Sequence, residues 1–360
     1  MPQQRARIRS LGIVVGELPT GPFNAITDVA GVLVGHTTLI YDQPCVARTG
    51  VTAIVPRNGA IADDCVFAGF HRFNGFGEMT GIQWIDETGL LTSPIILTTT
   101  NQIGMVRDAV TEYGFLRYQY GAYYLPVVAE TYDGWLNEMH GHPIQKEHVF
   151  QAFDSARSGP VTEGCVGGGT GMICHDFKGG IGTSSRLVST DSGNYTVGAL
   201  VQTNYGDRKQ LQINGVPVGR EIGFDIVPHP WQEPPRSSSI IIIIATDAPL
   251  LPVQCKRLAQ RATSGLARIG GFGHNSSGDL FLAFATGNHI TEPVHGIIHL
   301  EGMLPNDAMD GLFDATVEAV EESILNALTT AETMTGYQGH TVYAIPLDLL
   351  QQVIKRYRPV

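Results

Sequence analysis

RSSSIIIIIATDAPLL, residues Arg236–Leu251, places five consecutive isoleucines directly after three serines. β-Branched residues favour an extended backbone, and an unbroken apolar run is typical of a strand buried on both faces. The sequence therefore predicts a core strand at 240–244 whose entrance carries hydroxyl groups. On its own, the pattern fits an ordinary buried strand entered through a Pro-Pro and serine loop.

A second interpretation of the same stretch is that the chain is cut between Ser238 and Ser239. A serine hydroxyl is a weak nucleophile unless a base takes its proton. Cleavage would give Ser239 a free α-amine, whose unperturbed pKa of about 7.7 to 8.0 suits a general base near neutral pH. Nucleophile and base would then belong to one residue.

Composition limits the classes of function. The 360 residues carry 23 Lys and Arg against 34 Asp and Glu, a net charge of −11 without a basic run, so we expect no nucleic-acid partner. Five scattered cysteines without CxxC spacing support neither a disulfide framework nor a zinc site. Because no stretch approaches ~20 apolar residues and none near the start is long enough for export, we expect a cytoplasmic protein without membrane contact.

The first third of the chain is predicted to form short strands separated by turns, and most predicted helices follow it. The pattern predicts strands within 25–40, 50–57, 93–101, 125–133 and 196–207, and helices within 103–118, 146–156, 251–271 and 307–334. It also predicts a loop over 210–235. The glycine-rich segment 164–188 lacks a phosphate-binding motif, so its glycines are better explained by close approach of backbone segments.

Polar residues stand at the ends of several predicted strands. Glu130 and Tyr132 follow one apolar strand, where a carboxylate beside an aromatic ring can hold a cationic amine. Asn204 ends another strand and could donate its amide N–H to an oxyanion. Ser277 and Asp279, two residues apart at a strand entrance, can point to one side. Ordinary explanations exist as well: Glu130 could be a solvated turn residue, and Asn204, Ser277 and Asp279 are common turn formers.

Other chemistries have less support in the sequence. Histidines at 140, 142 and 148 lack helical i, i+4 spacing and an HExxH motif, so we expect no metal and no other cofactor. A GxSxG nucleophile motif and a recognised catalytic cysteine motif are both absent from the sequence. The remaining scheme has Ser239 attacking a carbonyl, Asn204 holding the oxyanion, and Ser277 with Asp279 orienting the nucleophile.

Several motifs together carry a family resemblance. ATDAPLLP after the isoleucine strand, NAITDVAGVLVGHTT, FKGGIGTSSR, GALVQTNYG and the SSGD segment resemble the family of L-aminopeptidase D-amidase/esterase and the β-peptidyl aminopeptidases, over nearly the full length. The resemblance implies an α/β fold, a four-layer α/β/β/α sandwich similar to that of N-terminal nucleophile hydrolases but with different connectivity. It also implies a single domain, 1–360, that cleaves itself into subunits 1–238 and 239–360 and assembles as a homo-oligomer, usually a tetramer.

The same resemblance assigns roles to residues. It makes Ser239 the self-cleavage site and nucleophile and Asn204 an oxyanion donor. Ser277 and Asp279 match a supporting serine and carboxylate. The set is completed by Glu130, which matches the carboxylate that binds the substrate's amine, and by Tyr132, which matches an active-site tyrosine. The chain departs from the family pattern twice: Asp279 stands where some members have Glu, and Ser238 where Gly or Asn is common.

The resulting expectation is a self-processing serine aminopeptidase that acts on small peptides, amides or esters with a free amine. Two alternatives stay open. One is an acyltransferase similar to the ornithine acetyltransferases, whose nucleophile is usually Thr; the other is an uncleaved, non-catalytic homologue. The sequence does not decide between α- and β-aminoacyl substrates.

Overall fold

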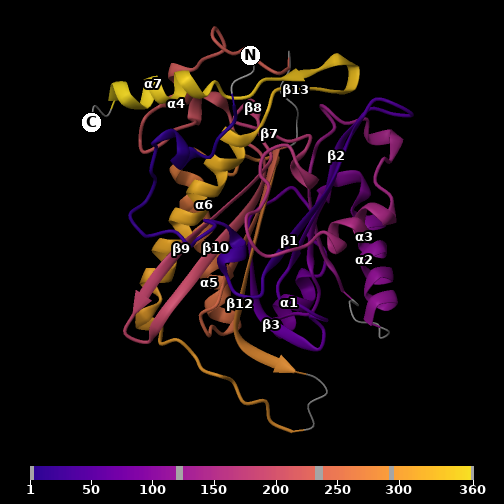
Figure 1. Cartoon of the computed structure of the whole chain (residues 1–360), viewed down its shortest axis with the longest axis vertical. Coiled ribbons are helices and arrows are strands. Elements are labelled where there is room, and N and C mark those ends of the chain that lie inside the picture. Colours follow the sequence, from indigo (N-terminus) through magenta and orange to yellow (C-terminus); the bar gives the residue numbers. More distant parts are fainter. Residues whose placement is uncertain (1–3, 119–124, 232–237, 292–295, 358–360) are drawn as a thin grey trace.

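A computed structural model describes residues 4–118, 125–231, 238–291 and 296–357 of the chain (Figure 1). Its larger sheet has the strand order β4-β3-β12-β11-β10-β9, and its smaller sheet the order β1-β2-β5-β6. The strands of the larger sheet are β3 (Asp64–Gly75), β4 (Leu90–Leu91), β9 (Ile181–Thr190), β10 (Gly193–Asn204), β11 (Ser238–Thr246) and β12 (Ser277–Thr291). Those of the smaller sheet are β1 (Leu33–Tyr41), β2 (Ala47–Val55), β5 (Ile95–Thr99) and β6 (Val127–Thr131).

Short strands and helices complete the described chain. Two small hairpins pair β7 (Ile173–Cys174) with β8 (Phe177–Lys178), and β13 (Met334–Thr335) with β14 (Thr341–Val342). The α-helices are α1 (Ile82–Thr88), α2 (Ile103–Tyr118), α3 (Lys146–Asp154), α4 (Val218–Glu221), α5 (Pro252–Arg268), α6 (Asp310–Thr330) and α7 (Leu347–Tyr357).

The two sheets and their helices form four layers. Helices α5 and α6 pack on the larger sheet, against β3, β12, β9 and β10, while α2 and α3 pack on the smaller sheet (Figure 1). The two sheets face each other, since β6 contacts β10 and β11. The mixed α/β architecture, with its α/β/β/α order of layers, confirms the predicted fold class.

Strand β11 explains the isoleucine run. Ile240, Ile242 and Ile244 belong to the core between the larger sheet and its helices, whereas Ile241 and Ile243 belong to the core between the two sheets. All five are fully buried. Because successive side chains of a strand point to opposite faces, a strand between two apolar layers needs apolar residues at every position. The predicted burial on both faces is confirmed.

Glycines allow the tight packing of β9. A Cβ atom at Gly182 would overlap the backbone of α6 at Ser323, and one at Gly180 would overlap the backbone at Gly164. Close approach of backbone segments is therefore the reason for glycine at both positions, as the sequence predicted for this glycine-rich segment.

The predicted helices agree closely with those observed, and two other predictions need correction. Residues 25–40 are not one strand: Ile26–Asp28 forms a 3-10 turn, because the Asp28 carboxylate accepts hydrogen bonds from the backbone N–H groups of Phe23 and Ala25, and β1 begins only at Leu33. The predicted loop over 210–235 contains the short helix α4, and its last part, 232–237, lies outside the described residues.

The topology gathers the ends of three strands at one place. β11 and β12 run parallel, so their first residues, Ser238 and Ser277, lie side by side. β10 runs antiparallel to β11, which puts its last residue, Asn204, opposite Ser239. None of the helices in the described part of the chain combines the length and apolarity that a membrane crossing requires.

Candidate active site

Ser239 lies at the entrance of β11 with its side chain buried. Only 2% of the residue is exposed, and its Oγ donates a 2.6 Å hydrogen bond to the carbonyl oxygen of Ser238. The backbone N–H of Ser238 donates to Ser276 O at 3.2 Å, which fixes the preceding residue to the start of β12. The hydroxyl is thus held against the carbonyl of the peptide bond that the sequence analysis singled out.

Ser277 and Asp279 form a pair beside these serines. Ser277 Oγ donates to Asp279 Oδ1 at 2.6 Å and lies 3.3 Å from Ser238 Oγ. A hydroxyl has one hydrogen, and the shorter, charge-assisted bond takes it, so a lone pair of Ser277 faces Ser238. The predicted common orientation of Ser277 and Asp279 is confirmed.

The carboxyl of Asp279 is perturbed by its surroundings. Burial raises its pKa to about 6, although hydrogen bonds from Ser277 and from the backbone N–H of Ile240 favour the charged form. A carboxyl with such a pKa changes charge close to neutral pH, which suits a group that receives or orients a proton.

Asn204 has a fixed amide orientation. Its Oδ1 accepts a 2.9 Å hydrogen bond from the backbone N–H of Ile173, and the residue is 7% exposed. Because Oδ1 is engaged, the amide NH₂ is the end that remains for a ligand. Its register partner on β11 is Ser239, so a donor of the type found in oxyanion holes stands beside the serine.

Glu130 lies at the end of β6, beneath the larger sheet. Its carboxylate accepts hydrogen bonds from the backbone N–H of Glu78, at 2.9 Å, and from Thr100 Oγ1. Burial raises the pKa of Glu130, and these two hydrogen bonds oppose the shift. Gly77 lies between this carboxylate and Gly278, since a Cβ atom there would be 3.2 Å from Glu130 Oε1 and 3.1 Å from Gly278 Cα. Gly278 is the register partner of Ser239 on β12.

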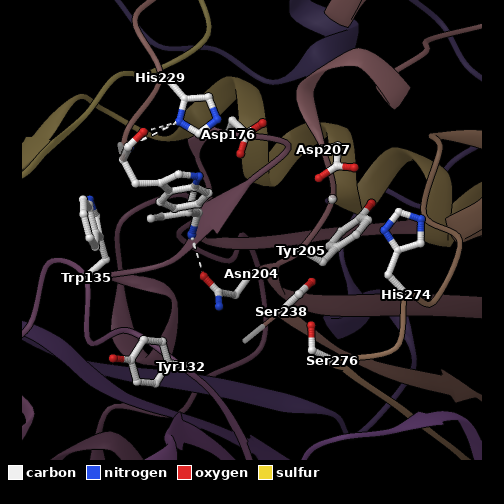
Figure 2. A pocket seen from close by; sticks show the side chains of 13 residues that line it. Tyr132, Trp135, Asp176, Asn204, Tyr205, Asp207, His229, Ser238, His274 and Ser276 are labelled. Atoms are coloured by element: carbon white, nitrogen blue, oxygen red, sulfur yellow. Dashed lines mark hydrogen bonds between the residues drawn. The ribbon is translucent and has the colours of Figure 1, made fainter. Parts of the chain in front are cut away.

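A cavity of about 160 Å³ opens next to these residues. Figure 2 shows Asn204 and Ser238 on its floor, with Tyr132 and Trp135 on one side and Tyr205 and His274 on the other. The full lining is Tyr132, Trp135, Ile173, Asp176, Asn204, Tyr205, Gly206, Asp207, His229, Trp231, Ser238, His274 and Ser276. Of the two site residues predicted at the end of β6, Tyr132 lines the cavity and Glu130 does not.

Sequence reasoning missed most of this lining and the two donors that hold Glu130. Some of these lining residues could have been found from their closeness in sequence to predicted site residues. Asp207 follows Asn204 by three residues, and His274 and Ser276 lie within three residues before Ser277. Nothing local marks Trp135, Trp231 or Asp176, because loops far apart in sequence bring them to the site. Among the described residues, no group of three His, Cys, Asp or Glu side chains is placed to hold a metal ion.

The chain is similar to known peptidases over almost its full length. A sequence model of peptidase family S58 matches residues 24–342. The chain belongs to this family. It is 44% identical to the β-peptidyl aminopeptidases BapA of Sphingosinicella microcystinivorans and Sphingosinicella xenopeptidilytica, in each case over 98% of this chain and 92% of the relative. The family membership makes the chain a peptidase, which confirms the predicted class of enzyme.

Solved structures agree with this assignment. A β-aminopeptidase from a Burkholderia species superposes with a TM-score of 0.91 at 49% identity, covering 98% of this chain and 99% of the other. L-Aminopeptidase D-Ala-esterase/amidase from Ochrobactrum anthropi superposes with a TM-score of 0.88 at 42% identity, covering 98% of each chain. The latter is described as a prototype for serine aminopeptidases and a new variant of the Ntn hydrolase fold, and both structures support the predicted resemblance.

Proposed function

We propose that this S58 peptidase is a self-processing serine aminopeptidase with Ser239 as its N-terminal nucleophile. The observation that carries the proposal is the 2.6 Å contact of Ser239 Oγ with the carbonyl oxygen of Ser238, at a site that also holds the Ser277–Asp279 pair and the Asn204 amide. An attacking hydroxyl, a proton acceptor and an oxyanion donor are the parts that acyl transfer needs.

Self-processing would begin with attack by Ser239 Oγ on the carbonyl carbon of Ser238. The hydroxyl proton passes toward the Ser277–Asp279 pair, which contacts Ser238 through the 3.3 Å approach of Ser277 Oγ to Ser238 Oγ. The C–N bond breaks as the nitrogen of Ser239 takes a proton. The product is an ester between Ser238 and Ser239 Oγ. Water then hydrolyses this ester, which leaves a carboxylate on Ser238 and a free hydroxyl and amine on Ser239.

The two products would be subunits 1–238 and 239–360. They stay together because β11, at the start of the second subunit, pairs antiparallel with β10 of the first, from Ser239–Asn204 to Thr246–Val197. The five buried isoleucines add apolar contacts on both faces of β11, each worth about 1.5–3 kcal/mol when fully buried. The new N-terminus is thereby fixed within the domain.

In the peptidase reaction the same parts act on a substrate. The α-amine of Ser239 takes the hydroxyl proton, Oγ attacks the substrate carbonyl, and Asn204 donates to the oxyanion. Glu130 holds the substrate's free amine, and Tyr132 contacts the substrate from the wall of the neighbouring cavity. The relatives named β-peptidyl aminopeptidases support N-terminal β-aminoacyl residues as the substrate class, and the relative named L-aminopeptidase supports small L-α-aminoacyl residues as the second class.

We also propose a homo-oligomer, a tetramer of two-subunit protomers. Its support is an apolar segment after β12 that projects from the larger sheet (Figure 1), where Ile297 is 82% exposed and Met303 is 53% exposed. Exposed apolar side chains of this density mark surfaces that another chain covers. Light scattering on the purified protein would test the assembly, and a monomer at micromolar concentration would contradict it.

The enzymatic proposal is tested by hydrolysis of β-alanyl-p-nitroanilide and L-alanyl-p-nitroanilide. We expect the wild-type protein to hydrolyse the β-alanyl compound, and Ser239→Ala to release no p-nitroaniline from either one. Ser189→Ala, a change at a serine of β9 outside the site, is the matched control and should behave as wild type. Hydrolysis by Ser239→Ala at the wild-type rate would remove Ser239 from the mechanism.

A further inference from the structure

The cavity of about 160 Å³ extends away from the proposed amine site. Its lining includes Asn204 and Ser238 but not Glu130. Glu130 instead lies beyond Gly77, on the β12 side of Ser239. On the proposed function, on which this step rests, the substrate's amine is at Glu130 and its carbonyl at Asn204. The cavity then receives the part of the substrate on the leaving-group side of the scissile bond.

Two aspartates, Asp176 and Asp207, line the cavity, and neither forms an ion pair among the described residues. The described lining contains no Lys or Arg. Asp207 is exposed, whereas Asp176 is only 6% exposed. His229 and His274 also line the cavity, as Figure 2 shows.

The guanidinium of Arg208 makes its hydrogen bonds with backbone carbonyl groups. It donates to the carbonyl oxygens of His175, Asp176 and Val227 and stacks 3.6 Å above the Phe177 ring. Only the backbone N–H of Arg208 reaches the Asp176 carboxylate, by a 2.9 Å bond to Oδ2. Burial raises the pKa of Asp176, and this hydrogen bond and the nearby positive charges act against the shift. A cationic ligand would favour the charged form further.

Aromatic rings form the walls of the same cavity. The Trp135 ring contacts the Trp231 ring edge-on, with 5.8 Å between centroids, and stacks on the His340 ring, with 3.7 Å between centroids. These two contacts fix the orientation of the Trp135 ring. Tyr205 is 5% exposed, and its hydroxyl has no hydrogen-bond partner among the described residues. Figure 2 shows Tyr205 on the same side of the cavity as Asp207 and His274. A buried, unpartnered polar atom at a cavity is a place where a ligand group completes the hydrogen bonding.

We infer that this cavity is a leaving-group subsite that prefers a residue with a cationic side chain, lysine or arginine, directly after the scissile bond. Aromatic faces and carboxylates are the two kinds of group that bind ammonium and guanidinium ions. The volume is below the ~300 Å³ at which pockets for whole ligands begin, so it fits a single side chain. The substrate class is therefore an N-terminal aminoacyl group joined to a basic residue.

Two amides that differ in one charged group test the inference. β-Alanyl-L-lysinamide and β-alanyl-L-norleucinamide share the acyl group and the alkyl chain, and only the first carries an ammonium ion. We expect the wild-type enzyme to show a kcat/KM at least tenfold higher for the lysinamide at low salt. Because ions screen exposed charges, the ratio of the two values should fall as salt rises to 0.5 M.

Variants assign the preference to the carboxylates. Asp207→Asn should lower the lysinamide to norleucinamide ratio at least threefold, and since Asp207 is exposed this change leaves the core intact. Asp176→Asn should also lower the ratio, with intact mass confirming that the variant is processed. Asp314→Asn, an exposed aspartate of α6 outside the cavity, removes the same net charge and should keep the wild-type ratio.

Each result decides a different point. Equal values of kcat/KM for the two amides in an enzyme that hydrolyses β-alanyl-p-nitroanilide would overturn the subsite and leave the proposed function standing. If Asp176→Asn and Asp207→Asn both keep the wild-type ratio of kcat/KM for the lysinamide to that for the norleucinamide, the role of these carboxylates is overturned. Failure to hydrolyse all three substrates would overturn the proposed function itself and the subsite with it.

Discussion

Replacement of Asn204 tests how much the oxyanion donor contributes to catalysis, independently of the other site residues. Asn204 Oδ1 accepts a hydrogen bond from the Ile173 N–H, which leaves the NH₂ group free to donate, and Ser239 is the register partner of Asn204. Loss of one oxyanion donor typically lowers kcat by about 10²- to 10³-fold, or about 2.7–4 kcal/mol. Asn204→Ala should therefore show a kcat lowered by this factor with little change in KM, since the donor acts mainly in the transition state.

Asn204→Ala is also expected to lower the free energy of unfolding, and this effect must be measured separately from the effect on kcat. Asn204→Ala leaves the buried N–H of Ile173 without an acceptor, at a cost of about 1–3 kcal/mol in the free energy of unfolding. Asn204→Asp is the matched control, because it keeps an acceptor for the Ile173 N–H but places a carboxylate where the oxyanion develops. The stability of Asn204→Asp should therefore be closer to that of the wild type. Its kcat should be at least as low as that of Asn204→Ala.

The assay is steady-state hydrolysis of β-alanyl-p-nitroanilide, with kcat divided by the fraction of cleaved chain that intact mass gives for each preparation. This correction is needed because self-cleavage uses the same oxyanion donor. A kcat within threefold of wild type for cleaved Asn204→Ala would refute the oxyanion assignment, whatever its effect on stability.

Three further predictions concern buried groups of the site and core. Glu130→Gln removes a charge but keeps the side chain's size, so we expect normal self-cleavage and a kcat/KM about 10- to 100-fold lower for amine-bearing substrates, as loss of a charge-assisted bond predicts; unchanged kinetics would exclude Glu130 from amine binding. The raised pKa of Asp279, about 6 in the uncut chain, predicts that the self-cleavage rate measured by gel densitometry falls as pH drops below about 6, because protonation removes the acceptor; Asp279→Asn should be slow and lack this dependence. Ile242→Ala, in an uncut Ser239→Ala background, should lower the free energy of unfolding in urea by about 2–5 kcal/mol, while Val253→Ala, at a position 64% exposed, should change it by less than about 0.5 kcal/mol.

Much of the fold was predictable because its signals are local. The isoleucine run marks β11 without reference to other segments, and Pro252 and the apolar spacing mark α5 almost to the residue. The start of β1 was not predictable in this way, because Asp28 binds backbone N–H groups in a turn that apolar pattern alone does not reveal.

The candidate site likewise has a part that the sequence predicts and a part that it does not. Asn204, Ser277 and Asp279 stand at strand ends next to β11, so strand order alone brings them to Ser239. The cavity wall was beyond the sequence because Trp135 and Trp231 come from loops almost 100 residues apart. Long-range packing of loops leaves no periodic trace in the chain.

Intact mass and N-terminal sequencing of the purified protein test the central proposal most directly. We expect two fragments that co-purify, 1–238 and 239–360, with serine as the first residue of the smaller fragment, and a single uncut chain for Ser239→Ala. A wild-type protein that remains one chain of 360 residues while hydrolysing β-alanyl-p-nitroanilide would contradict an N-terminal serine mechanism.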